Sequence, residues 1–203
     1  MNKEITKVQL FEDSIFEVKI EDANNSEILE FYEDKRFKYE GHTRSNYGGW
    51  QAFISPGECK AYDEVLEKIN VAANDIFKNE YGLNDDIKIA NSWLNANDFG
   101  SSNLNHTHPG CAYSGVYYIN ASKDDKKNGS ILFENPQTFA IASSMIAYGQ
   151  PHTYYDHPQL RQSYMIPPKV GYAYLFMPWI QHAVTRNLSH FNRIVIGMNF
   201  NRI

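Results

Sequence analysis

The change of pattern after residue 84 constrains the fold of this chain more than any other sequence feature. From there onward, segments of six to ten residues rich in Val, Ile, Tyr and Phe alternate with clusters of Gly, Pro, Asn and Asp. This alternation is typical of all-β structure. Eight such segments crowded into about 115 residues favour a two-sheet jelly roll or barrel over an open sheet. The expected strands are 87–96, 113–121, 129–134, 140–148, 161–167, 171–179, 182–187 and 193–201.

The preceding part of the chain is expected to be mainly helical. Residues 62–81 place Val65, Ile69, Ala73 and Phe77 on one face of a helix, and Gly82 is a natural C-cap. A shorter helix is expected over 22–37, and residues 41–58 are rich in turn-forming residues. Residues 7–20 predict two short strands around an Asp-Ser turn, as an edge hairpin. With 203 residues we expect a single domain, in which 1–85 packs on a β-core formed by 86–203.

Composition narrows the function classes. The net charge is −5 and the sequence pI about 5.8, which disfavours binding to duplex nucleic acid. Two cysteines cannot form a disulfide framework, so a reducing, cytoplasmic location is expected. No run approaches 18 apolar residues, and we therefore expect no association with a membrane.

Three histidines are candidates for a metal site. In the stretch NHTHPG, an extended backbone would place His106 and His108 on one face, about 6.6 Å apart. His182, in the distant stretch PWIQHAV, would supply a third imidazole. Non-haem iron sites use three protein ligands, usually two His and one carboxylate. The remaining coordination positions of the iron stay open. Two alternatives stay open from the residues alone: the pair could be ordinary surface histidines, or a carboxylate such as Asp98 or Glu134 could be the third ligand.

An ordered set of motifs resembles the iron- and 2-oxoglutarate-dependent oxygenases of the prolyl-hydroxylase type. The set spans residues 91–200 and runs W-x-N (93–95), H-x-H-P (106–109), S-G-V-Y-Y (114–118), F-x-x-P (133–136), H-x-V (182–184) and R-I-x-x-x-x-N-F (193–200). The combination is most similar to small, mostly uncharacterised oxygenases of bacteria and phages. The resemblance implies a double-stranded β-helix core and a dioxygenase that requires Fe(II), 2-oxoglutarate and dioxygen. Such an enzyme hydroxylates a substrate C–H bond and releases succinate and CO2.

The same resemblance assigns roles to residues. His106, His108 and His182 are expected to bind the metal. Arg193, eleven positions after His182, corresponds to the basic residue that pairs with the far carboxylate of 2-oxoglutarate, and Tyr118 to a phenol that hydrogen-bonds the same group. Trp93 and Asn95 fall where the family lines the cosubstrate pocket.

One position departs from the family pattern. His108 stands where the liganding Asp is usual. Three neutral imidazoles leave the +2 charge of ferrous iron intact, so a 2-oxoglutarate dianion would neutralise it. An all-nitrogen site would also accept zinc, nickel or copper readily, following the Irving–Williams order.

Two other functions remain open at this stage. One is a cupin-like metalloenzyme that uses the histidines without 2-oxoglutarate, and the other is a non-catalytic jelly-roll binding protein. The substrate, a small molecule or a peptide, is not specified by the sequence. The many tyrosines would suit a homodimer interface, and the aromatic-rich segment 137–168, with 41–50, is a candidate for shaping substrate access.

Overall fold

The computed structural model of the chain describes residues 13–124, 127–138, 140, 143 and 161–203. Its named elements are two helices, α1 (Asn25–Lys38) and α2 (Lys60–Tyr81), and eleven strands. The strands are β1 (Ile15–Lys19), β2 (Asn46–Tyr47), β3 (Trp50–Phe53), β4 (Ile87–Asn97), β5 (Ser102–His106), β6 (Tyr113–Asn120), β7 (Ile131–Glu134), β8 (Ser163–Ile166), β9 (Tyr172–Phe176), β10 (His182–Val184) and β11 (Arg193–Arg202). In the described part of the chain no helix is long and apolar enough to cross a membrane.

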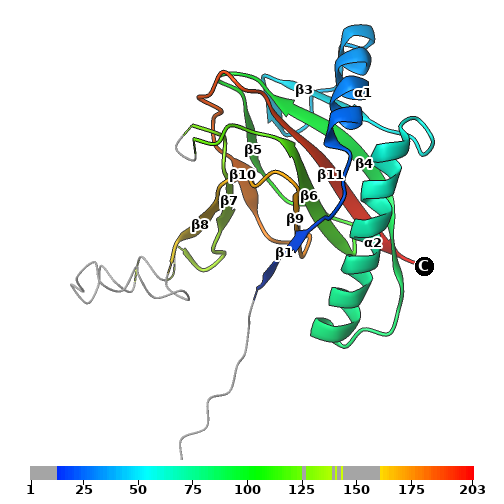
Figure 1. Cartoon of the computed structure of the whole chain (residues 1–203). Coiled ribbons are helices and arrows are strands. Elements are labelled where there is room, and N and C mark those ends of the chain that lie inside the picture. The colour runs from blue at the N-terminus through cyan, green and yellow to red at the C-terminus, as the bar shows by residue number, and fades with distance from the viewer. Residues whose placement is uncertain (1–12, 125–126, 139, 141–142, 144–160) are drawn as a thin grey trace, which may run out of the picture.

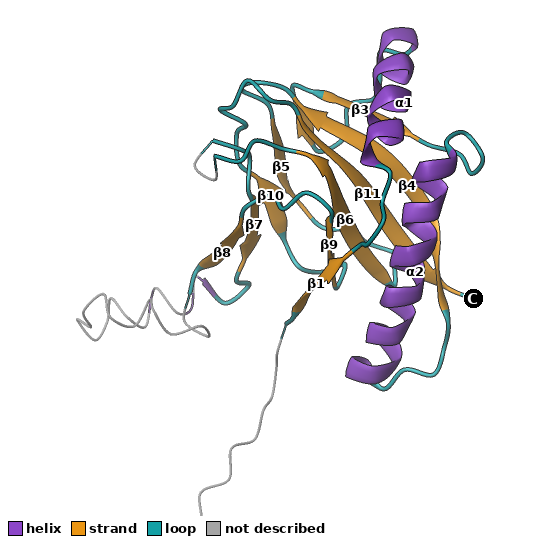
Figure 2. Cartoon of the chain, in the orientation of Figure 1, coloured by secondary structure: helices purple, strands orange, loops and turns teal. Residues whose placement is uncertain are grey.

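The strands form two antiparallel sheets. The larger has the order β1-β9-β6-β11-β4-β3 and the smaller β2-β5-β10-β7-β8. Both helices lie on one side of the larger sheet and the smaller sheet lies on its other side (Figure 1; Figure 2). The chain is therefore mainly β, as expected, with two sheets in the arrangement of a double-stranded β-helix.

The two helices follow the sequence pattern closely. Val65, Ile69, Ala73 and Phe77 are all buried on one face of α2, because residues four apart lie above one another on a helix. The helix ends at Gly82, whose φ of 62° is the left-handed conformation that glycine adopts without steric cost. The side chain of Asn24 accepts a hydrogen bond from the Glu27 backbone and caps α1. Both helices contribute to one hydrophobic core with the larger sheet.

Several expectations about strands need correction. Residues 41–58 were expected to be turns but contain β2 and β3, and β5 was not expected at all. All three strands are short, β2 and β5 are mostly polar, and each forms because it pairs with a distant segment. The strand expected over 140–148 is wrong where it can be tested, since Ala140 and Ser143 are helical. Of the hairpin over 7–20, only β1 lies within the described residues, and it pairs with β9 at the edge of the larger sheet.

Candidate functional site

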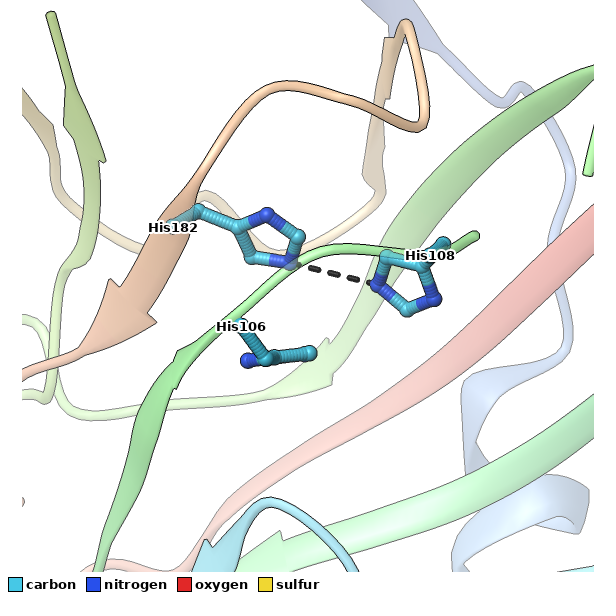
Figure 3. Close-up of side chains that lie close together, drawn as sticks. All are labelled: His106, His108 and His182. Carbon is cyan, nitrogen blue, oxygen red and sulfur yellow. Dashed lines mark hydrogen bonds between the residues drawn. The ribbon is translucent and has the colours of Figure 1, made fainter. Parts of the chain in front are cut away.

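Strand pairing brings the three histidines together. His106 is the last residue of β5 and His182 the first of β10, and the two are direct partners across this antiparallel pair. His108 lies two residues beyond β5, where its backbone N–H donates to the Pro178 carbonyl at 2.9 Å. The ring centroids are 4.4 Å apart for His106 and His182, and 5.1 Å apart for each pair that includes His108. One ring nitrogen from each residue lies within 4.8 Å of the others (Figure 3).

Backbone carbonyls fix the orientation of two of these rings. The Nδ1 atom of His106 lies 2.7 Å from the Leu104 carbonyl, and that of His182 lies 2.9 Å from the Ile180 carbonyl. A carbonyl only accepts hydrogen bonds, so Nδ1 carries the proton in both rings. Each Nε2 atom is left with a lone pair, which is the form of histidine that binds metals.

Burial keeps these rings neutral. His182 is buried, and its removal from water lowers the pKa to about 3. The same effect lowers the pKa of His108 to about 4, with a further contribution from the neighbouring His106, and burial also lowers the pKa of His106. Three neutral imidazoles are a donor set that fits a divalent transition metal.

A cavity of about 700 Å³ surrounds the histidines, and a buried cation lies in its wall. Arg193, at the start of β11, is 2% exposed and makes no ion pair with a described acidic residue. One of its Nη atoms donates to Asn97 Oδ1 at 3.0 Å and the other to the Tyr118 hydroxyl at 3.3 Å, while Nε has no partner. A buried charge of this kind is costly unless an anion compensates it. The carboxylate of a diacid would be such an anion.

A network of amides supports this arginine. Asn97 accepts from Arg193 and also from Asn95, at 3.0 Å, and it donates to Asn103 at 3.1 Å. Asn103 donates in turn to the hydroxyl of Ser45 at 3.2 Å. Asn97 was not singled out from the sequence, although the alternation of Asn91, Trp93, Asn95 and Asn97 along one strand was the available signal.

Trp93 and Asn95 line the cavity, as expected for them. The Trp93 indole stacks on the His108 ring, with centroids 6.0 Å apart and planes inclined by 21°. It occupies the space above Gly197 of β11, where an added Cβ would lie 2.3 Å from the indole. Tyr118 is fully buried and reaches the cavity wall through its bond to Arg193, whereas Tyr117 points to the opposite face and donates to Asn25 of α1.

Neither alternative carboxylate belongs to this histidine group. Asp98 forms a two-pronged ion pair with Arg36, at 2.8 and 2.6 Å. Glu134 and Asp98 are both absent from the described cavity lining. Among the described residues, the three histidines are the one group with the spacing of a metal site. Of the two segments expected to shape access, 41–50 contributes Thr43, Arg44 and Ser45 to the lining, whereas Tyr148, His152, Tyr154, Tyr155 and His157 lie outside the described residues.

Comparison with solved structures shows the fold. A prolyl-4-hydroxylase from Pseudomonas putida is 15% identical, with a TM-score of 0.65 and 94% of each chain covered. A viral collagen prolyl hydroxylase from Paramecium Bursaria Chlorella virus-1 is 14% identical, with a TM-score of 0.59, and the match covers 92% of this chain and 94% of that one. HygX from Streptomyces hygroscopicus, solved with nickel and 2-oxoglutarate bound, is 10% identical with a TM-score of 0.61, covering 93% of this chain and 83% of that one.

Comparison at the sequence level shows the family. No curated protein matches the sequence. Residues 91–199, more than half of the chain, match the model of a family described as "Putative 2OG-Fe(II) oxygenase". These residues include all three histidines, the buried arginine and most of the cavity wall. The chain therefore belongs to this family of 2-oxoglutarate- and Fe(II)-dependent oxygenases.

Proposed function

We propose that this oxygenase holds Fe(II) with His106, His108 and His182, anchors 2-oxoglutarate through Arg193 and Tyr118, and hydroxylates a C–H bond of a substrate that enters the same cavity. One observation carries the proposal: three imidazoles, each with a ring nitrogen within 4.8 Å of the others, and one buried guanidinium without an acidic partner among the described residues lie in the wall of a single cavity. A metal-binding protein that does not use a diacid has no need of that guanidinium.

The iron, when bound with 2-oxoglutarate and dioxygen, supplies the oxidising chemistry, and succinate and CO2 are the by-products. The protein's own contribution is positioning. The Leu104 and Ile180 carbonyls hold two imidazoles in the tautomer that presents Nε2 to a metal. Asn97 and Tyr118 orient the guanidinium, so that it can pair with a carboxylate through two parallel hydrogen bonds. The indole of Trp93 and the ring of Phe176 shield His108 from water.

Anaerobic titration of 2-oxoglutarate into iron-loaded protein tests the anchoring of the cosubstrate. A visible metal-to-ligand charge-transfer band should appear. We expect Arg193→Ala to weaken 2-oxoglutarate binding about 10- to 100-fold, which corresponds to losing charge-assisted hydrogen bonds worth about 1.5–3 kcal/mol. Because Arg193 is buried, the milder Tyr118→Phe variant accompanies it and should weaken binding by a smaller factor. An unchanged affinity in a folded Arg193→Ala variant would remove Arg193 from the site.

Metal content tests the ligands. His182→Ala should lose bound iron, as measured by elemental analysis after anaerobic reconstitution. His190→Ala is the matched control, because His190 is exposed and stacks on Phe99 away from the cavity. Equal metal content in both variants would contradict the ligand assignment. Iron bound by the parent protein without any 2-oxoglutarate band would favour the cupin-like alternative.

A further inference from the structure

The described wall of the cavity contains basic groups and no acidic ones. Its described lining residues include two cations, Arg44 and Arg193, and none of them is Asp or Glu. The chain as a whole is acidic, with a net charge of −5, so the charge of this cavity wall has the opposite sign to that of the whole chain. An excess of one sign of charge in a recessed site favours ligands of the other sign.

The ligand set adds to this excess. An imidazole binds a metal as a neutral ligand, whereas a carboxylate in the place of His108 would carry −1. The charges of a metal dication and a 2-oxoglutarate dianion then cancel. The positive charges of Arg193 and Arg44 remain. With a carboxylate ligand in place of His108, the net charge of the loaded cavity would be lower by one unit. In a partly desolvated cavity such an uncompensated charge interacts more strongly than it would in water.

Arg44 is the group placed to meet a second anion. The segment 43–46 runs beside β5, the strand that ends at His106, and is fixed there by a hydrogen bond from Leu104 N–H to the Ser45 carbonyl at 2.7 Å. The Arg44 backbone N–H also donates to Asn46 Oδ1 at 2.7 Å. Its side chain is exposed, lines the cavity and forms no ion pair with any acidic residue that the structure describes. By contrast, Arg36 and Arg202 each pair with an aspartate.

We infer, resting on the function proposed above, that the substrate is an acid, carrying a carboxylate or a phosphate group that Arg44 binds at the mouth of the cavity. Arg193 is buried and serves the cosubstrate, whereas Arg44 is exposed and accessible to an incoming molecule. Arginine suits this role because its planar fork pairs with either oxyanion through two hydrogen bonds. Arg44 is thus a specificity-determining residue.

The test measures binding to the anaerobic complex of protein, Fe(II) and saturating 2-oxoglutarate. The probes are N-acetyl amino acids against their primary amides, and phosphate monoesters against the parent alcohols. Dissociation constants come from the change that each probe causes in the charge-transfer band. The two series distinguish a carboxylate from a phosphate preference. The band itself shows whether 2-oxoglutarate stays bound.

The variants are Arg44→Gln and, as a matched control, Arg186→Gln, since Arg186 is exposed and is not among the cavity-lining residues. We expect acids of at least one series to bind the parent and Arg186→Gln about tenfold more tightly than their neutral partners, and Arg44→Gln to lose this preference. If no acid binds more tightly than its neutral partner, or if Arg44→Gln keeps the preference, the inference is wrong. If the band never forms, the proposed function fails instead.

Discussion

The side chain of Asn97 compensates part of the buried positive charge of Arg193 without any cosubstrate. Its Oδ1 atom accepts from the guanidinium at 3.0 Å, and the residue is fully buried. An amide oxygen carries only a partial negative charge, so most of the positive charge of the guanidinium stays uncompensated. The neutral amide at this position therefore leaves the arginine available to a carboxylate from outside.

The substitution Asn97→Asp should have two effects of opposite sign. A carboxylate at 97 would pair with Arg193 internally, which should raise the free energy of unfolding of the metal-free protein. It should also compete with 2-oxoglutarate and weaken its binding by about tenfold or more. Urea unfolding measures the first effect and the anaerobic titration the second. Retention of full cosubstrate affinity would show that Arg193 is not the anchoring group.

At the residue scale, the sequence pointed to the groups that carry reactive chemistry more readily than to those that support them. His106, His108 and His182 could be proposed from their pattern and from the family resemblance, and the structure brings them together. Asn97 and Asn103 could not, because asparagine is common in loops and strands alike, and only strand pairing shows that these amides meet at one guanidinium.

At the scale of elements, the attachment of β1 to the larger sheet depends on more than its ladder of backbone hydrogen bonds. Glu17 of β1 accepts a hydrogen bond from the Lys169 ammonium at 2.6 Å and another from the Tyr174 hydroxyl of β9 at 2.8 Å. The contact with Lys169 lowers the pKa of Glu17 below its ordinary value. The folded state therefore binds the proton less tightly than the unfolded chain does.

Glu17→Gln should reduce the free energy of unfolding at pH 7 by less than about 1 kcal/mol, since the pair is partly exposed and screened by solvent. The sign of the shift means that this contribution is present above about pH 4.3, the unfolded pKa of Glu, and is lost as the pH falls through the lower folded value. Urea unfolding over pH 3–7 should show the difference between parent and variant shrinking on the acidic side. Glu21→Gln, at an exposed pair with Lys19, is the control and should show little effect. A difference that grows as the pH falls would contradict this account.

Elements with a strong internal pattern were predictable, and those defined by their partners were not. The apolar face of α2 and the alternation in β11 mark these elements without reference to the rest of the chain. β2 has two residues, and β5 reads SNLNH, which carries no alternation of apolar and polar side chains. Both strands form because they pair with each other and β5 also pairs with β10.

At the scale of the whole molecule, the proposed function places the metal and the cosubstrate between the two sheets, so both should stabilise the folded chain as a unit. We expect Zn(II), which does not activate dioxygen, to raise the melting temperature of the metal-free protein. Adding 2-oxoglutarate at about 100 times its dissociation constant should contribute about 2.7 kcal/mol more, or roughly 5–10 °C for a chain of this size. Differential scanning calorimetry measures both steps.

Arg193→Lys is the comparison variant for this experiment. It should keep the shift caused by the metal and lose most of the shift caused by 2-oxoglutarate, because an ammonium cannot form the paired hydrogen bonds of a guanidinium. A cosubstrate shift of equal size in the parent and in this variant would mean that the diacid binds elsewhere.

The position of β11 has a consequence for how the molecule is made. This strand follows all other named strands along the chain, yet it lies in the interior of the larger sheet, between β6 and β4. While the ribosome is still producing the preceding residues, β4 and β6 each lack a neighbour and expose an unpaired edge, the kind of surface on which nascent chains aggregate. Arg193, the buried arginine of the cavity wall, is the first residue of the same strand. The chain can complete its larger sheet and position Arg193 in the cavity wall only together, after β11 has left the exit tunnel.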